Sequence, residues 1–283
     1  MRAPAKINLT LEVLALRSDG YHGVRSVMVP IDLADELTIE PSTRFSFECD
    51  RDELAGERNL AVAALHALGE LPAVRMRLLK RIPVQAGLGG GSSDAAAVLR
   101  AAMAGAFGPA PRREWMQIAR SLGSDVPFFL AGTAALVEGT GERVTPAGAI
   151  PTWNVLIVKP PVEVSTTQAY REIDASERLQ RPRSDCVSIA MLEALQRAEF
   201  PRVQALLQND FHDVIATSTP EVMAALDALR AAGATNALLA GSGSCVFALS
   251  PEKAHIEALA RRLTLPPKYE RFVTRFATTP EWR

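Results

Sequence analysis

Apolar and polar residues alternate along several short stretches of this chain. Single polar residues separate Leu37 from Ile39 and Phe45 from Phe47, and Arg75 and Arg77 separate the apolar residues of Val74–Leu78. Side chains on a strand point alternately to its two faces, so a period of two predicts half-buried strands of an antiparallel sheet. Further strands are expected over Thr133–Val137 and Val155–Val158, and a strand, glycine turn and strand over Ala237–Phe247.

Helices are predicted where apolar periodicity lies between start and stop residues. We expect helices over Asn59–Leu68, with Asn59 as the N-cap, and over Arg112–Leu122, ended by Gly123. Two more should start at Thr219-Pro220 and at Ser250-Pro251, since proline favours the first helical position. The mixture predicts an α+β protein in two halves, 1–150 and 151–283, joined near Ile150.

Composition excludes several classes of protein. The 283 residues are 48% hydrophobic and 22% charged, with a net charge of -1, which argues against a nucleic-acid partner. No apolar run is long enough for a membrane span, and no secretory signal is visible, so we expect a cytoplasmic protein without a membrane partner. Cys49, Cys186 and Cys245 are too far apart to predict a disulfide framework or a zinc site.

The segment Pro83–Ser93 is the most informative part of the chain. Four glycines lie within five residues, from Gly87 to Gly91, and an alanine-rich helical run follows. Glycines let backbone N–H groups approach a ligand, and Ser92 or Ser93 is expected to cap the helix, whose positive end then faces the loop. The segment therefore predicts a phosphate site. It lacks the lysine of a P-loop and the third glycine of a dinucleotide fingerprint, and the alternative is a flexible turn before a buried helix.

Polar residues elsewhere are candidates for the chemistry. Lys6, Asn8 and Thr10 share one face of a strand over Pro4–Leu11, although such a face is often simply solvated. Tyr21 and His22 follow an Asp-Gly turn, where they would suit a flat heteroaromatic ligand or would be surface residues.

Asp125 lies between a helix-ending glycine and an apolar run. It needs a cation partner, a catalytic role, or a place as the cap of a short helix. The glycine-rich loop over Gly241–Ser244 is either a hairpin turn or a second loop around the same phosphate.

Together these segments resemble the GHMP kinase superfamily. The matching pieces follow in the expected order over nearly the whole chain: P-A-K-I-N-L at Pro4–Leu9, D-G-Y-H at Asp19–His22, G-L-G-G-G-S-S-D-A-A at Gly87–Ala96, G-S-D-V-P-F-F at Gly123–Phe129 and G-S-G-S-C-V-F at Gly241–Phe247. Each piece is weak alone, whereas the combination is specific. The extra glycines and the D-G-Y-H segment point to the branch that acts on a cytidyl substrate.

The resemblance implies a two-domain α+β fold, with the phosphate loop in the N-terminal domain and a ferredoxin-like C-terminal domain. It implies that ATP, with Mg²⁺, phosphorylates the 2-hydroxyl of 4-diphosphocytidyl-2-C-methyl-D-erythritol in non-mevalonate isoprenoid biosynthesis. The expected partner is this small molecule, and the chain is expected to be a monomer or a weak homodimer.

The resemblance also implies roles for individual residues. Asp125 would be the catalytic base and Lys6 its cationic partner, while the metal ligands stay unassigned, with Ser93 as one candidate. Ser124 stands where the family tends to have alanine. The expected triphosphate cradle consists of Pro83, Val84, Gln85, Ala86, Gly87, Leu88, Gly89, Gly90, Gly91, Ser92 and Ser93. The expected substrate-binding residues are Asn8, Tyr21 (stacking on cytosine), His22 (hydrogen bonding to it), Thr166 and Tyr170.

Three other functions remain open at this stage. Another kinase of the superfamily, such as a mevalonate or homoserine kinase, would lack the D-G-Y-H segment. A ligand-sensing regulator would not need both Lys6 and Asp125. An RNA-binding module is disfavoured by the near-zero net charge.

Overall fold

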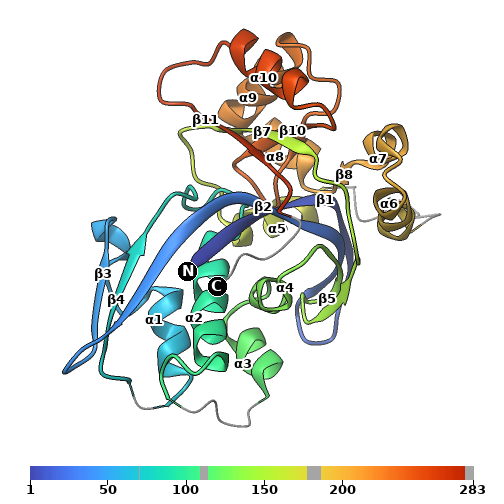
Figure 1. Ribbon diagram of the computed structural model, residues 1–283. Coiled ribbons are helices and arrows are strands. Elements are labelled where there is room, and N and C mark those ends of the chain that lie inside the picture. The colour runs from blue at the N-terminus through green and yellow to red at the C-terminus, as the bar shows by residue number, and fades with distance from the viewer. Residues whose placement is uncertain (70, 109–113, 177–185, 278–283) are drawn as a thin grey trace.

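Two sheets and their helices make up the part of the chain that the computed structural model describes, residues 1–69, 71–108, 114–176 and 186–277. The larger sheet has the strand order β3-β4-β2-β1-β8, and β5 pairs with both β2 and β6. The smaller sheet has the order β11-β7-β10-β9. Figure 1 shows the larger sheet with helices α1–α4 beneath it, and the smaller sheet with helices α8–α10 in a second lobe.

The strands of the larger sheet are β1 (Arg2–Leu16), β2 (His22–Pro41), β3 (Ser46–Cys49), β4 (Val74–Leu79), β5 (Ala135–Gly139), β6 (Arg143–Pro146) and β8 (Gln208–Asn209). Those of the smaller sheet are β7 (Asn154–Lys159), β9 (Leu238–Leu239), β10 (Val246–Ser250) and β11 (Glu270–Arg275). The helices of the first half are α1 (Leu60–His66), α2 (Gly90–Met103), α3 (Trp115–Leu122) and α4 (Val126–Ala131), with a 3₁₀ turn, η1, over Asp52–Leu54. Those of the second half are α5 (Thr166–Asp174), α6 (Val187–Gln196), α7 (Phe200–Leu206), α8 (His212–Ser218), α9 (Pro220–Ala231) and α10 (Lys253–Arg262).

Alternating side chains of the strands divide the core into layers. On β7, Val155 and Ile157 pack into the cluster between the two sheets, which also contains Ile7 and Leu9 of β1. The intervening residues, Leu156 and Val158, pack against α5 and α8–α10 on the other face of the smaller sheet. Because both faces of β7 are covered, its central residues form the continuous apolar run seen in the sequence.

Several predicted elements are confirmed. The alternation over Val74–Leu78 is β4, and the hairpin over Ala237–Phe247 is the antiparallel pair β9 and β10. The side chain of Asn59 accepts a hydrogen bond from the Ala61 N–H at 2.9 Å, so Asn59 does cap α1. The α+β class is confirmed by both sheets and their helices.

Other boundaries were wrong by a few residues. Strand β5 begins at Ala135 and continues through Gly139. Helix α10 begins at Lys253, because Ser250 Oγ accepts from the Glu252 N–H and holds Pro251 in a turn before the helix. Thr219 does lie at the N-cap of α9, but its side chain makes no capping hydrogen bond.

The predicted start of the helix over Arg112–Leu122 and the predicted division at residue 150 are not tested by the structure. Helix α3 begins at Trp115, and residues 112 and 113 of the predicted helix lie outside the described part. The division at residue 150 stays a prediction: β7 starts the second sheet at Asn154, while β8 returns to pair in parallel with β1. Within the described residues, no helix is both long and apolar enough to cross a membrane.

Candidate active site

The glycine-rich loop over residues 83–93 packs directly against the loop over residues 241–244. Gly87 has φ +75°, and a Cβ placed on it would lie 1.9 Å from the carbonyl oxygen of Ala240. The Cys245 N–H donates to the Ala86 carbonyl at 3.2 Å, and the Lys6 N–H donates to Leu88 at 3.0 Å. Glycine is required at position 87 because the two backbones approach so closely. The loop over residues 241–244 is thus the turn between β9 and β10, and it also lies beside the first glycine loop, as the alternative of a shared phosphate site requires.

Helix α2 starts inside the glycine run. Gly89, with φ +73°, is the N-cap in a left-handed conformation, and the helix begins at Gly90. The prediction that Ser92 or Ser93 caps this helix was wrong, because both serines lie in its first turn and the Ser93 N–H already donates to Gly89. The helix nevertheless presents its N-terminus and its unpaired N–H groups to the loop, as a phosphate site requires.

Lys6 and Asp125 come together from β1 and from the start of α4. Lys6 Nζ lies 3.7 Å from Asp125 Oδ2 and donates to Asn8 Oδ1 at 2.8 Å. Lys6 and Asn8 are buried, which overturns the alternative of a solvated strand face. Burial lowers the pKa of the Lys6 ammonium, and the neighbouring charge of Asp125 opposes this shift.

Asp125 occupies the N-cap position of α4, yet its side chain makes no capping hydrogen bond. The alternative that the carboxylate serves as a helix cap is therefore wrong. About a third of its side chain (36%) is exposed, so the carboxylate is open to a ligand. A half-open carboxylate beside a buried ammonium can accept a proton from an alcohol held between them.

Aromatic rings gather at another part of the same cleft. The Tyr170 and His22 rings are stacked, with centroids 5.6 Å apart and planes inclined by 13°. Phe211 meets Tyr170 edge-on at 5.0 Å. Tyr21 is 68% exposed, and Thr166 Oγ1 lies 3.2 Å from Ser242 Oγ, which joins the start of α5 to the second glycine loop.

Both ring nitrogens of His22 face protein oxygen atoms. Nδ1 lies 2.7 Å from the carbonyl oxygen of Leu14, and Nε2 lies 2.9 Å from Asp174 Oδ1. The expectation that the His22 side chain hydrogen-bonds to cytosine stays a prediction. In this structure Nδ1 is hydrogen-bonded to Leu14, whereas Nε2 lies beside Asp174 without the geometry of a hydrogen bond.

One continuous cleft, with a volume of about 1130 Å³, contains these groups. It is lined by every predicted site residue except Leu88 and Ser93. Those two side chains are buried beneath the loop and do not line the cleft in this structure. The sequence analysis placed all of these residues in one site, and the structure brings together the side chains of all except Leu88 and Ser93.

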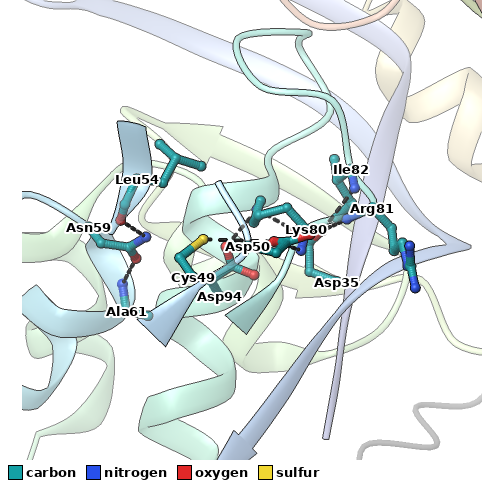
Figure 2. A network of polar contacts seen from close by, with 10 residues as sticks. All are labelled: Asp35, Cys49, Asp50, Leu54, Asn59, Ala61, Lys80, Arg81, Ile82 and Asp94. Carbon is teal, nitrogen blue, oxygen red and sulfur yellow. Dashed lines mark hydrogen bonds and ion pairs between the residues drawn. The ribbon is translucent and has the colours of Figure 1, made fainter. Parts of the chain in front are cut away.

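A buried charge network under the loop was missed by the sequence analysis (Figure 2). Lys80 Nζ donates to Asp35 Oδ2 at 2.5 Å and to Asp94 Oδ2 at 2.7 Å. Asp35 Oδ1 also accepts from the N–H groups of Arg81 and Ile82, which lead into the loop. Two carboxylates share one ammonium here, and burial raises the pKa of Asp94 to about 8. The only signal in the sequence was the position of Lys80 just before the loop and of Asp94 just after its serines.

Comparison with known proteins identifies the family. The family model for the GHMP kinases N terminal domain matches residues 59–133, and that for GHMP kinases C terminal matches residues 191–266. A 4-diphosphocytidyl-2-C-methyl-D-erythritol kinase of Deinococcus radiodurans is 39% identical, over 92% of this chain and 87% of the relative. The enzyme of the same name from an Anaeromyxobacter species is 42% identical, over 87% of this chain and 80% of the relative.

The chain belongs to the 4-diphosphocytidyl-2-C-methyl-D-erythritol kinase family. A crystal structure of 4-(cytidine 5'-diphospho)-2C-methyl-D-erythritol kinase is 37% identical and superimposes with a TM-score of 0.78, over 98% of this chain and 99% of that one. A mevalonate kinase of L. major is 15% identical with a TM-score of 0.68, over 98% of this chain and 95% of that one, which shows a shared fold alone.

Membership of this kinase family implies that the chain uses ATP. The glycine loop and the α2 N-terminus fit a polyphosphate, because the first N–H groups of α2 have no partner within the helix and Gly89, Gly90 and Gly91 line the cleft. The part of the chain that the structure describes contains no group of three or more acidic, histidine or cysteine side chains arranged to hold a metal ion. No metal ligand of the kinase is therefore assigned from the protein side.

Proposed function

We propose that this chain transfers the γ-phosphoryl group of ATP to the 2-hydroxyl of 4-diphosphocytidyl-2-C-methyl-D-erythritol. The observation that carries the proposal is the Lys6–Asp125 pair, 3.7 Å apart in the same cleft as the glycine loop. The names of the relatives, at 39% and 42% identity, support the choice of acceptor.

The loop and α2 supply the site for the donor. Backbone N–H groups at the start of the helix would hold the phosphates, and the helix dipole would balance part of their charge. Mg²⁺ would accompany the nucleotide and neutralise charge on its oxygens. We keep Ser93 as the candidate side chain for it, since Ser93 Oγ is buried and has no hydrogen-bond partner in the structure.

Asp125 and Lys6 would act on the phosphoryl acceptor, 4-diphosphocytidyl-2-C-methyl-D-erythritol, called the acceptor below. The tertiary hydroxyl would approach Asp125, which takes its proton as the oxygen–phosphorus bond forms. The Lys6 ammonium would stabilise the negative charge that develops between nucleophile and phosphate. Asn8, which accepts from Lys6, would fix the position of the ammonium and contact the acceptor.

The aromatic end of the cleft would bind the cytosine of the acceptor. Tyr21 and Tyr170 would stack on the base, and His22 would contribute hydrogen bonding through Nε2, which has no hydrogen-bond partner among the described residues. Thr166 would lie beside the acceptor at the start of α5.

We also propose that the enzyme works in the cytoplasm, as a monomer or a weak homodimer, without a nucleic-acid or membrane partner. The net charge of -1 supports the absence of a nucleic-acid partner. The three free cysteines are consistent with a reducing compartment.

A coupled assay of ADP release with ATP and the cytidyl substrate tests the proposal, and phosphorus NMR of the product locates the new ester. We expect ADP release that depends on this acceptor and a phosphomonoester at its 2-oxygen. Mevalonate and homoserine, tested in parallel, should give no turnover. Turnover of either one, or a product phosphorylated at another hydroxyl, would refute the assignment.

A further inference from the structure

Asp174 is the last residue of α5, and its carboxylate contacts the imidazole ring of His22. The proposed function gives Asp174 no role. Asp174 Oδ1 lies 2.9 Å from Nε2 of His22, whose side chain is only 7% exposed. The opposite nitrogen, Nδ1, lies 2.7 Å from the carbonyl oxygen of Leu14. The imidazole is thus hydrogen-bonded at Nδ1 to the end of β1, and at Nε2 it contacts the Asp174 carboxylate of α5 without the geometry of a hydrogen bond.

This double contact fixes the plane of the ring. A carbonyl oxygen can only accept, so Nδ1 carries a hydrogen when it bonds to Leu14. With Leu14 alone, the ring could still turn about its outer torsion, since sp³–sp² torsions have broad energy wells. The Asp174 carboxylate beside Nε2 favours the same orientation through its charge, which attracts the ring when Nε2 also carries a hydrogen.

The fixed ring in turn forms part of the cleft wall. His22 stacks on Tyr170 at 13° between the planes, and Phe211 packs edge-on against the same tyrosine. His22, Tyr170 and Asp174 all line the cleft. A flat base that stacks in this region therefore meets a wall whose tilt depends on the Asp174–His22 contact.

We propose that Asp174 is a positioning residue for the pyrimidine of the acceptor, acting through His22 on the aromatic wall. This inference rests on the proposed function, because it assumes that a cytidyl group binds there. Asp174 has no part in the donor site or in proton transfer. Its loss should weaken binding of the acceptor and leave the other steps intact.

Steady-state kinetics of four chains test this proposal: wild type, Asp174→Ala, Asp174→Asn and Glu172→Ala. Asp174→Ala should raise the KM for the acceptor about 3- to 5-fold, the upper part of the range for an ion pair with a half-exposed partner. The KM for ATP and kcat should stay within 2-fold. Asp174→Asn should recover only part of the loss, because an amide keeps the size of the side chain beside Nε2 but not its charge.

Glu172→Ala is the matched control. It removes a carboxylate from the same helix, but Glu172 binds Gln168 and Ser218 and does not line the cleft. Its acceptor KM should remain within 2-fold of wild type.

A double-mutant comparison shows whether Asp174 acts through His22. In a His22→Gln chain, adding Asp174→Ala should change the acceptor KM by less than 2-fold. An unchanged KM in the single Asp174→Ala chain overturns the proposal, as does an equal rise in the His22→Gln background or an equal rise in the KM for ATP. If wild-type enzyme releases no ADP with this acceptor, the proposed function itself fails; the variants decide only the role of Asp174.

Discussion

Replacing Gly87 with alanine tests whether the two glycine loops must touch for the enzyme to work. A Cβ at this position would lie 1.9 Å from the Ala240 carbonyl oxygen, and Cβ atoms essentially never approach a neighbour closer than 3.0 Å. Relief requires the loops to separate by at least about 1.1 Å, the difference of these two distances. Such a movement also strains the hydrogen bond from Cys245 to Ala86.

The structure offers a matched control for the backbone cost. Gly148 has φ +74°, nearly the same as the +75° of Gly87, but nothing lies within 4 Å of its Cβ position. Alanine in the left-handed region costs about 1–2 kcal/mol at either position. Gly87→Ala should lose a further ~1–3 kcal/mol, since overpacking adds to the backbone cost.

The effect on activity should differ more than the effect on stability. A misplacement of about 1 Å in a positioned site can cost ~10²-fold in rate, so Gly87→Ala should lower kcat/KM for ATP by about that factor. Gly148→Ala should stay within about 2-fold of wild type. Thermal unfolding and initial rates of both variants, measured below their transition temperatures, give the comparison. Equal kcat/KM values in the two variants would refute the claim that contact between the loops shapes the donor site.

Three further predictions address the remaining parts of the cleft. Asp125→Asn should retain ATP binding by calorimetry but lower kcat by about 10²–10⁴, and a near-normal kcat would remove Asp125 from the role of base. Tyr21→Ala should weaken acceptor binding by about 1–3 kcal/mol and leave ATP affinity unchanged, whereas equal losses for both ligands would count against stacking on cytosine. Burial raises the pKa of Asp94 from 3.8 to about 8. At pH values between these two, Asp94 holds a proton in the folded chain that it has released in the unfolded chain. The free energy of unfolding of wild type should therefore fall as pH rises from 5.5 to 8, by up to ~1.4 kcal/mol per pH unit more than that of Asp94→Asn. Denaturant unfolding of both chains at the two pH values measures this difference. An equal change of the free energy of unfolding in the two chains would contradict the prediction.

The elements whose formation depends on residues close together in the sequence were predicted correctly. The alternation at Val74–Leu78 became β4 because its apolar residues are buried, Met76 and Leu78 in one core cluster, and its arginines face solvent. Asn59 capped α1 because an asparagine oxygen before a helix satisfies an N–H that would otherwise be unpaired. These outcomes depend on neighbours within a few residues, so a single sequence contains enough information to predict them.

Burial was harder to predict than the direction of a side chain. The period of two placed Lys6 and Asn8 on the same strand face, and the structure joins them by a hydrogen bond of 2.8 Å. Whether that face met water or a cleft depended on α4, which begins at Val126, far along the chain. For the same reason, composition favoured a solvated lysine at a position that the fold buries.

The error at the start of α2 and the missed charge network have one physical origin. A serine cap was expected because the helix was assumed to begin after the glycines, yet Gly89 turns the chain and Gly90 already belongs to the helix. That earlier start places Asp94 on a buried turn, where it meets Lys80, which directly follows β4, and, through Lys80, Asp35 of β2. Two buried carboxylates and one ammonium are costly unless they are paired, so the network forms only because strand and helix hold its members together. The glycines thus determine the backbone of the donor site locally, whereas the pairing of its buried charges depends on tertiary contacts. This is why the sequence predicted the glycine loop but not the charge network.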